Sequence, residues 1–247
     1  MRELEVKKDA IQNTFGCGYE STIYKYFDSD YYDKVVLYKK FNMFEHTNPD
    51  FLENKKQKLL LIPEIEELKN DVKVLDLLYT DGKFTGYTME KSDNEIFDMF
   101  DKKKIKIKLL KMIRDRIEIL NSKGIYIGDF NERNFLTSKD RSIIQMCDLD
   151  NLRIGEYDFD VCDKIEKRFL DRCGDLDALD SYCFNLFTIS FLGRFDIGYL
   201  SDYFTWEHVH KCLFTKENKE IIESMIRLNS NYKKSYLIDN IKTKSLF

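Results

Sequence analysis

The stretch GIYIGDFNERNFLTSKDRSIIQMCDLDN, residues 124–151, carries acidic and amide side chains on two neighbouring predicted loops. Asp129 and Asn134 lie on the first loop, and Asp148 and Asp150 lie on the second. A short β-like run, residues 143–147, precedes the second loop, so a hairpin can join the two loops. Carboxylate and amide oxygens are the kind of ligand that Mg²⁺ accepts from proteins. The stretch therefore places three or four such ligands on two adjacent loops.

The composition is that of a globular protein rather than a disordered chain. The 247 residues are 43% hydrophobic and 34% charged, enough for one large domain or one two-lobed domain. The net charge of −4 gives no general attraction to nucleic acids or acidic membranes, so neither is expected as a partner. The apolar runs are too short to span a bilayer, and the N-terminal MRELEVKKDA is charged where a signal peptide is apolar. A cytoplasmic location is therefore expected.

The first 91 residues predict an antiparallel sheet that carries one helix. Three short runs rich in β-branched and aromatic residues are separated by turn-like segments: IQNTF, STIYKYF and KVVLYKKF. A helix follows over about residues 49–68, and Pro63 is expected to end or kink it. Asp81-Gly82 then predicts a hairpin between two further strands.

Beyond Ser92 the pattern becomes helical. Apolar residues recur at steps of four and three from Ile105 to Leu120, which predicts an amphipathic helix that ends near Gly124. Further helices are expected over about residues 177–192 and 217–229. The face of this amphipathic helix opposite Ile105 and Leu120 is expected to be a solvated surface rather than a binding patch. It holds Lys102, Lys103, Lys104, Lys106, Lys108 and Lys111.

A strand-rich segment followed by a helical one, with acidic loops near the join, resembles the layout of protein kinases. IGDFNERNFL, residues 127–136, is similar to the kinase catalytic loop H-R-D-L-x-x-x-x-N, with Asp129 and Asn134 five residues apart. Asp148-Leu149-Asp150 stands where kinases have D-F-G, 19 residues after Asp129. The resemblance implies that Asp129 receives the attacking hydroxyl, while Asn134 and Asp148 hold Mg²⁺ on the phosphates of ATP.

The glycine stretch GCGYESTIY, residues 16–24, resembles the kinase phosphate loop G-x-G-x-x-G-x-V. Gly16 and Gly18 would let the backbone approach phosphates, while Ser21 replaces the third glycine and Ile23 the valine.

VLYK, residues 36–39, stands where kinases have V-A-I-K. Alternation along a strand puts Leu37 and Lys39 on one face and Lys40 on the other. Leu37 is therefore expected to cover the adenine, and Lys39 to reach the α- and β-phosphates.

The resemblance also implies supporting residues. Met89 would lie at the back of the adenine pocket, and Glu90 and Lys91 would offer backbone groups to adenine. Kinases hold the strand lysine with a helix glutamate, for which Glu53 is the candidate. Asp180, in LDALDSYCFNLFTISFL, would brace the backbone of the catalytic loop.

Four positions depart from the kinase pattern. Ile127-Gly128 replaces the His-Arg pair before Asp129, and Asn131 stands where protein kinases keep a lysine that helps the γ-phosphate. Asp150 replaces the D-F-G glycine, and no A-P-E follows it before Asp180. Switching by phosphorylation of the activation loop is therefore not expected, and the usual platform for protein substrates is in doubt.

The expected fold is α+β and bilobal, protein-kinase-like, with residues 1–91 as the N-lobe and residues 92–247 as a mostly helical C-lobe with a short activation segment. The expected activity is ATP- and Mg²⁺-dependent transfer of the γ-phosphate to a protein Ser or Thr hydroxyl. A small-molecule kinase and a non-catalytic nucleotide-binding or interaction module remain as alternatives. Because the four chemistry residues are all present, an active enzyme is favoured: Lys39, Asp129, Asn134 and Asp148.

Overall fold

The computed structural model describes residues 1–18, 20–42, 49–96, 101–157, 175–193, 214–230 and 234–242. These residues form a mixed α+β structure in two compact units. The first unit comprises Met1–Asp93 and Gln145–Asp150, and the second comprises Asn94–Ile144 and Asn151–Phe247. The boundary predicted after residue 91 thus lies two residues before Asp93, where the first stretch of this unit ends. The first unit also includes residues 145–150, which were expected in the C-lobe.

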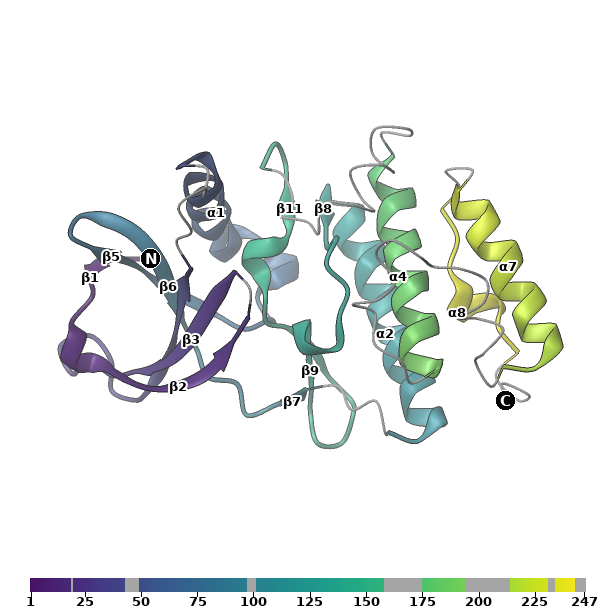
Figure 1. Cartoon of the computed structure of the whole chain (residues 1–247), viewed down its shortest axis with the longest axis horizontal. Coiled ribbons are helices and arrows are strands. Elements are labelled where there is room, and N and C mark those ends of the chain that lie inside the picture. Colours follow the sequence, from purple (N-terminus) through teal and green to yellow (C-terminus); the bar gives the residue numbers. More distant parts are fainter. Residues whose placement is uncertain are drawn as a thin grey trace. The chain divides into compact units, whose positions relative to one another are not determined.

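The first unit is built on a six-stranded sheet in the order β1-β5-β6-β4-β3-β2 (Figure 1). The strands are β1 (Glu3–Glu5), β2 (Ile11–Cys17), β3 (Ser21–Tyr26), β4 (Val36–Phe41), β5 (Val74–Thr80) and β6 (Lys83–Met89). All neighbours are antiparallel except β1, which pairs with β5 in parallel. The expectation of a purely antiparallel sheet is therefore wrong at this edge. The cause is that β1 has three residues and only Leu4 among them is buried, which leaves no alternating pattern to recognise.

The register of the sheet confirms the predicted alternation in β4. Residues directly opposite one another on neighbouring strands point to the same face of a sheet. Lys39 lies opposite Ile23 on β3 and Tyr87 on β6, and Leu37 lies opposite Met89. These five side chains therefore share one face. Lys40 is exposed, as expected for the other face.

The other face of the sheet packs a small aromatic and aliphatic core that includes Tyr26, Val36, Tyr38 and Leu78. Gly86 is needed in β6 because a Cβ there would lie 2.1 Å from the carbonyl oxygen of Lys39. Close pairing of β4 and β6 at Lys39 thus depends on this glycine.

The β5–β6 hairpin turns at Asp81-Gly82, as predicted. Both residues have positive φ, 52° and 71°, which is the conformation of the tight hairpin turn that suits twisted strands.

Helix α1 (Pro49–Leu61) contacts β6 of the sheet. It ends before Pro63, and two short 3-10 turns follow at Ile62–Glu64 and Glu66–Leu68. The expected interruption at Pro63 is therefore confirmed, although the α-helix stops earlier than residue 68. The helix buries Lys55, Lys58 and Leu59, an unusual set because two of the three carry charge.

The described part of the second unit is mainly helical. It contains α2 (Lys103–Asn121), α4 (Leu176–Gly193), α7 (Lys216–Ser230) and α8 (Leu237–Asn240). Helix α2 packs against α4 and α8, and α4 packs against α7 (Figure 1). Short strands accompany them: β7 (Glu95–Ile96), β8 (Ile125–Tyr126), β9 (Phe135–Thr137) and β11 (Arg153–Ile154), while β10 (Ile144–Met146) carries the chain back to the first unit.

The helices expected near residues 105–120, 177–192 and 217–229 are all present. One lysine on the expected solvated face of α2 departs from the prediction, because Lys106 is buried and its Nζ donates to the carbonyl oxygen of Phe191 at 2.6 Å. A lysine stem is long enough to lie along apolar surface while its ammonium group finds a carbonyl. The expected activation segment includes residues 158–174, which lie outside the described residues.

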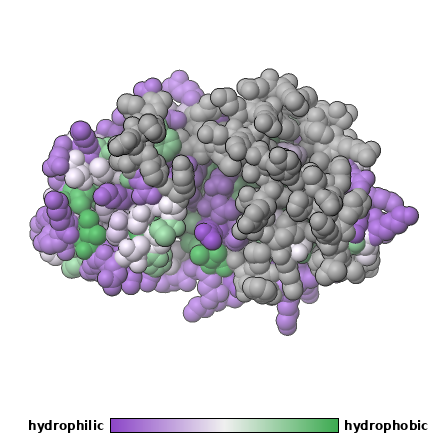
Figure 2. All heavy atoms as spheres, viewed as in Figure 1, coloured by the Kyte–Doolittle hydropathy of each residue, from purple (hydrophilic) through white to green (hydrophobic). Residues whose placement is uncertain are grey.

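None of the helices in the described ranges has both the length and the apolar content needed to cross a lipid bilayer. On the face of the molecule drawn in Figure 2, hydrophobic atoms of the described residues form small groups among hydrophilic ones.

Candidate functional site

Four charged side chains of the first unit form a buried cluster on the sheet face that carries Leu37 and Met89. We call this set, Lys39, Lys55, Asp148 and Asp150, the charged cluster. Lys39 Nζ donates to Asp148 Oδ1 and, at 2.7 Å, to Asp150 Oδ1. Lys55 Nζ donates to Asp150 Oδ2 at 3.0 Å, so the two oxygens of Asp150 are held by different lysines. Only Asp148 is appreciably accessible, with 23% of its side chain exposed.

Segments far apart in the sequence assemble this cluster. Lys39 comes from β4 and Lys55 from α1, whereas both aspartates come from the segment that follows β10. That segment is fixed to the chain before β5, because Met146 N–H donates to Asp71 Oδ1 at 2.8 Å and its carbonyl accepts from Val72 N–H at 2.9 Å. The backbone at residues 146–150 is thereby anchored within the first unit.

Tyr87 completes the buried surroundings of Asp150. Its hydroxyl donates to Asp150 Oδ1 at 2.7 Å, and burial together with the nearby carboxylates raises the pKa of this phenol well above its ordinary value. Tyr87 therefore remains a hydrogen-bond donor at every physiological pH.

The two aspartates differ in their electrostatic surroundings. Burial alone would raise the pKa of Asp150, but Lys39 and Lys55 outweigh it and hold the pKa well below its ordinary value. Burial raises the pKa of Asp148, an effect that Lys39 opposes and the negative charge of Asp150 reinforces. Asp150 is thus the permanent counter-ion of both lysines. Asp148 is the carboxylate whose charge gains most from an additional cation, and it is also the accessible one.

The predicted phosphate loop, residues 16–24, covers the end of β2, the turn and the start of β3, and packing does not require its glycines. Gly18 N–H donates to the carbonyl oxygen of Ser21 at 2.8 Å, closing the turn. Among the described residues, no atom lies within 4 Å of a Cβ placed on Gly16, and only the Ser21 carbonyl, at an ordinary 3.8 Å, approaches one on Gly18. Neither glycine has a positive φ. The absence of side chains here therefore has no explanation in the packing of the described residues.

Glu20 ties this loop to helix α1. Its Oε2 accepts from Lys55 Nζ at 3.3 Å. Ser21 and Ile23, the other predicted loop residues, lie at the start of β3, where Ile23 is directly opposite Lys39 and Ser21 opposite Phe41.

At the end of β6, the structure limits which of the predicted backbone groups could bind adenine. Met89 is buried opposite Leu37, on the face of the charged cluster. Glu90 N–H donates to the carbonyl oxygen of Lys73 at 2.9 Å, so this hydrogen bond leaves the carbonyl of Glu90, not its N–H, to a ligand. Lys91 is exposed.

The predicted pairing of Lys39 with Glu53 is wrong. Glu53 is exposed on α1 and accepts from Gln57 Nε2 at 2.6 Å, whereas the anions beside Lys39 are Asp148 and Asp150. The α1 residue that faces the cluster is Lys55, and sequence reasoning missed it because only glutamates were considered as partners of Lys39.

In the second unit, the predicted catalytic loop is held by Asp180, as the sequence indicated. Asp180 lies on α4 and accepts from Ile127 N–H at 3.0 Å and from Gly128 N–H at 2.9 Å. Burial raises the pKa of Asp180 to about 7 against the lowering effect of these two donors. Gly128 has a φ of 66°, a left-handed conformation that favours glycine at this turn.

Asp129 is oriented by two amide side chains of its own loop. Asn134 Nδ2 donates to Asp129 Oδ2 at 2.8 Å, and Asn131 Nδ2 lies 3.2 Å from both carboxylate oxygens. Asn131 also caps the 3-10 turn Glu132–Asn134, since its Oδ1 accepts from Arg133 N–H at 2.9 Å. The structure therefore brings Asp129, Asn131 and Asn134 together. It also gives Asn131 a local structural role in addition to the predicted catalytic one.

The donor set of the charged cluster suits a cation that brings its own additional ligands. Among the residues that the structure describes, no group of three or more His, Cys, Asp or Glu side chains could hold a metal ion. Mg²⁺ is commonly bound by one or two carboxylates, with phosphate and water oxygens completing its shell. The accessible Asp148 fits such a site when a nucleotide supplies the phosphates.

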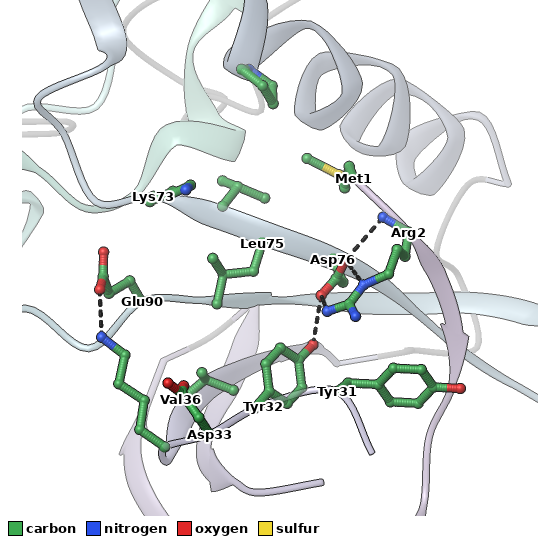
Figure 3. Close-up of a pocket in the computed structure, with 13 residues that line it drawn as sticks. Met1, Arg2, Tyr31, Tyr32, Asp33, Val36, Lys73, Leu75, Asp76 and Glu90 are labelled. Atoms are coloured by element: carbon green, nitrogen blue, oxygen red, sulfur yellow. Dashed lines mark hydrogen bonds and ion pairs between the residues drawn. The ribbon is translucent and has the colours of Figure 1, made fainter. Parts of the chain in front are cut away.

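A pocket of about 490 Å³ lies elsewhere in the first unit (Figure 3). Its lining includes Asp76, which accepts from the guanidinium of Arg2 at 2.6 Å and from the hydroxyl of Tyr32 at 2.9 Å. The Glu90 side chain at its rim accepts from Lys34 Nζ at 2.7 Å. Among the predicted site residues within the described ranges, only Glu90 lines this pocket, so it is separate from the charged cluster.

Comparison of the chain with models of known protein families and with curated proteins finds no match.

Proposed function

We propose that the protein is an ATP- and Mg²⁺-dependent phosphotransferase whose two units correspond to the lobes of a protein-kinase-like fold. The expected reaction transfers the γ-phosphate of ATP to a hydroxyl group. The observation that carries the proposal is the charged cluster, in which a buried strand lysine, Lys39, meets the accessible carboxylate of Asp148.

The surroundings of the cluster support a nucleotide as the ligand. Ile23, Leu37 and Met89 share its sheet face and are the apolar side chains proposed to lie beside the base. Packing of the described residues does not explain why positions 16 and 18 hold glycine. Gly16 and Gly18 are expected if the backbone there must approach phosphates closely. In this proposal Lys39 would contact the phosphates, and Asp148 would hold Mg²⁺, whose charge would offset that of the phosphate oxygens.

In the second unit, we assign the hydroxyl-activating role to Asp129. Its carboxylate is oriented by Asn131 and Asn134, and its loop is fixed by the hydrogen bonds from Ile127 and Gly128 to Asp180. A carboxylate that is held in this way can orient a hydroxyl and accept its proton.

A protein Ser or Thr hydroxyl is the first candidate acceptor. A small-molecule hydroxyl is the second, because the sequence lacks the A-P-E motif of the protein-substrate platform. A non-catalytic nucleotide-binding module would keep the charged cluster without phosphate transfer.

Calorimetric titration of the wild-type chain with Mg²⁺ and a non-hydrolysable ATP analogue tests the nucleotide claim. Lys39→Met should abolish binding, and Lys40→Met, one residue away on the exposed face, should retain it. No binding by the wild-type chain at millimolar analogue would refute the proposal. Radiolabelled ATP then distinguishes the acceptors: label in protein, label in a metabolite mixture, or, for a non-catalytic module, no transfer.

A further inference from the structure

Lys55 is a fully buried lysine on α1. It faces Asp150, the counter-ion of Lys39. Its side chain is 0% exposed, as is that of Asp150, its partner at 3.0 Å. Its ammonium group also lies 4.9 Å from the ring centre of Phe51 and 5.4 Å from that of Phe41. Burying an ammonium group costs free energy unless charged and aromatic groups compensate for its lost hydration. Asp150, Phe41 and Phe51 provide that compensation for Lys55.

The charges are reversed relative to the arrangement that protein kinases use. There, a glutamate on the helix holds the strand lysine. Here the helix contributes a cation, Lys55, and the anion comes from Asp150, which stands where the D-F-G motif has glycine. Because both oxygens of Asp150 are engaged, one carboxylate bridges two lysines from two different elements, while Asp148 and Glu20 supply further negative charge.

We propose that Lys55 and Asp150 form a charge-reversed replacement for the helix glutamate. Asp150 fixes Lys39 for the nucleotide, and Lys55 is the positioning residue that fixes Asp150. This inference rests on the proposed function, because it explains how the phosphate-binding lysine is held.

The contacts of Lys55 give this arrangement a consequence that a helix glutamate would lack. Through Glu20, at 3.3 Å, Lys55 also holds the glycine loop, and through Asp150 it holds the segment that carries Asp148. One ammonium group thus connects the loop assigned to the phosphates with the segment assigned to the metal. Loss of Lys55 should disturb nucleotide binding even though Lys39 and Asp148 remain.

A double substitution separates this proposal from a merely structural ion pair. Lys55→Glu alone puts three carboxylates around the single ammonium of Lys39 and adds one beside Glu20, whereas Asp150→Asn alone leaves Lys39 with Asp148 and Lys55 with Glu20. The combination Lys55→Glu with Asp150→Asn recreates the set that kinases use: one strand lysine, one helix glutamate and one metal-binding aspartate. The double variant should therefore be closer to the wild type than Lys55→Glu is.

Two measurements are made on the full chain. Melting temperatures without nucleotide should fall strongly for Lys55→Glu and recover by at least half in the double variant. Calorimetry with Mg²⁺ and a non-hydrolysable ATP analogue should show a smaller recovery in Kd, because the double variant does not restore the contact between Lys55 and Glu20. The milder Lys55→Gln, which keeps a polar side chain, should weaken analogue binding about 10- to 100-fold through loss of one charge-assisted hydrogen-bond network.

Lys56→Glu is the matched control, because Lys56 is the next residue of α1 and its Nζ lies 3.5 Å from Glu3 instead of facing the cluster. Its effect on melting temperature should add to that of Asp150→Asn without recovery. The inference is overturned if the double variant melts no higher than Lys55→Glu, or if Lys55→Gln melts lower but binds the analogue like the wild type. Failure of the wild-type chain to bind the analogue would instead remove the proposed function, and this inference with it.

Discussion

Replacing Lys39 with methionine should destabilise the chain and abolish nucleotide binding, while the same change at Lys40 should do neither. Lys39 is 6% exposed and serves two carboxylates, so its loss leaves Asp148 and Asp150 to share Lys55. Removing one partner of a buried ion pair costs about 3–5 kcal/mol. Asp148 is 23% exposed and can be partly hydrated, which favours the lower end of that range. For a chain of this size, about 3 kcal/mol corresponds to a melting temperature lower by about 6–12 °C.

The stability lost in Lys39→Met should depend on pH in a defined direction. Burial already raises the pKa of Asp148, and removal of the Lys39 ammonium raises it further. A carboxylate whose folded pKa lies above its unfolded pKa stabilises the fold at low pH and loses that contribution as the pH rises. The melting temperature of Lys39→Met should therefore approach that of the wild type at pH 5 and fall furthest below it at pH 8.

Thermal unfolding followed by circular dichroism at the two pH values, with Lys40→Met as control, measures these differences. A melting temperature of Lys39→Met within about 2 °C of the wild type at pH 8 would contradict a buried ion pair at Lys39, since such a pair predicts a much larger shift. A larger loss in Lys40→Met than in Lys39→Met would show that the strand register is shifted by one residue.

Three further variants test the remaining assignments. Gly16→Ala should leave the fold intact or stabilise it by up to about 1 kcal/mol, because its φ suits alanine, yet it should weaken analogue binding; unchanged affinity would contradict the loop's role. Asp129→Asn should spare analogue affinity in calorimetry and slow phosphate transfer about 10²–10⁴-fold; a lower melting temperature with normal turnover would make Asp129 a structural residue. With the pKa of Asp180 raised to about 7, the stability of the wild type relative to Asp180→Asn should decline as the pH rises from about 4 to about 7, by at most about 1.4 kcal/mol per pH unit; a difference in denaturant unfolding that is independent of pH would contradict this.

The parts of the fold that the sequence predicted depend on local patterns. The Asp81-Gly82 hairpin follows from two adjacent residues that tolerate positive φ, and the inward orientation of Lys39 follows from alternation along one strand. Strand β1 was missed because its pairing with β5 joins residues more than 70 positions apart, and three residues carry no periodic signal of their own.

The charged cluster illustrates the same limit for the site. A helix pattern treats Lys55 as a surface residue, because nothing near it in the sequence reveals that an anion lies 95 residues further along. One signal was available: the motif C-D-L-D carries an aspartate where the resembling family has glycine, and an added buried anion needs an added cation. The glutamate prediction at Glu53 failed because it kept the family's charge pattern after that substitution had changed it.

The return of residues 145–150 to the first unit affects how the chain can fold as it leaves the ribosome. Met1–Asp93 is synthesised first and includes Glu20, a partner of Lys55, but the buried carboxylates that hold Lys39 and Lys55 arrive only with Asp148 and Asp150. At about 5–20 residues per second, the intervening segment takes on the order of 3–11 seconds to translate. During that interval the nascent sheet and helix carry two ammonium groups that must stay hydrated, so this face cannot close prematurely. Completion of the first unit is thereby timed to the synthesis of the second, and a fragment ending at Asp93 should remain incompletely folded however long it is given.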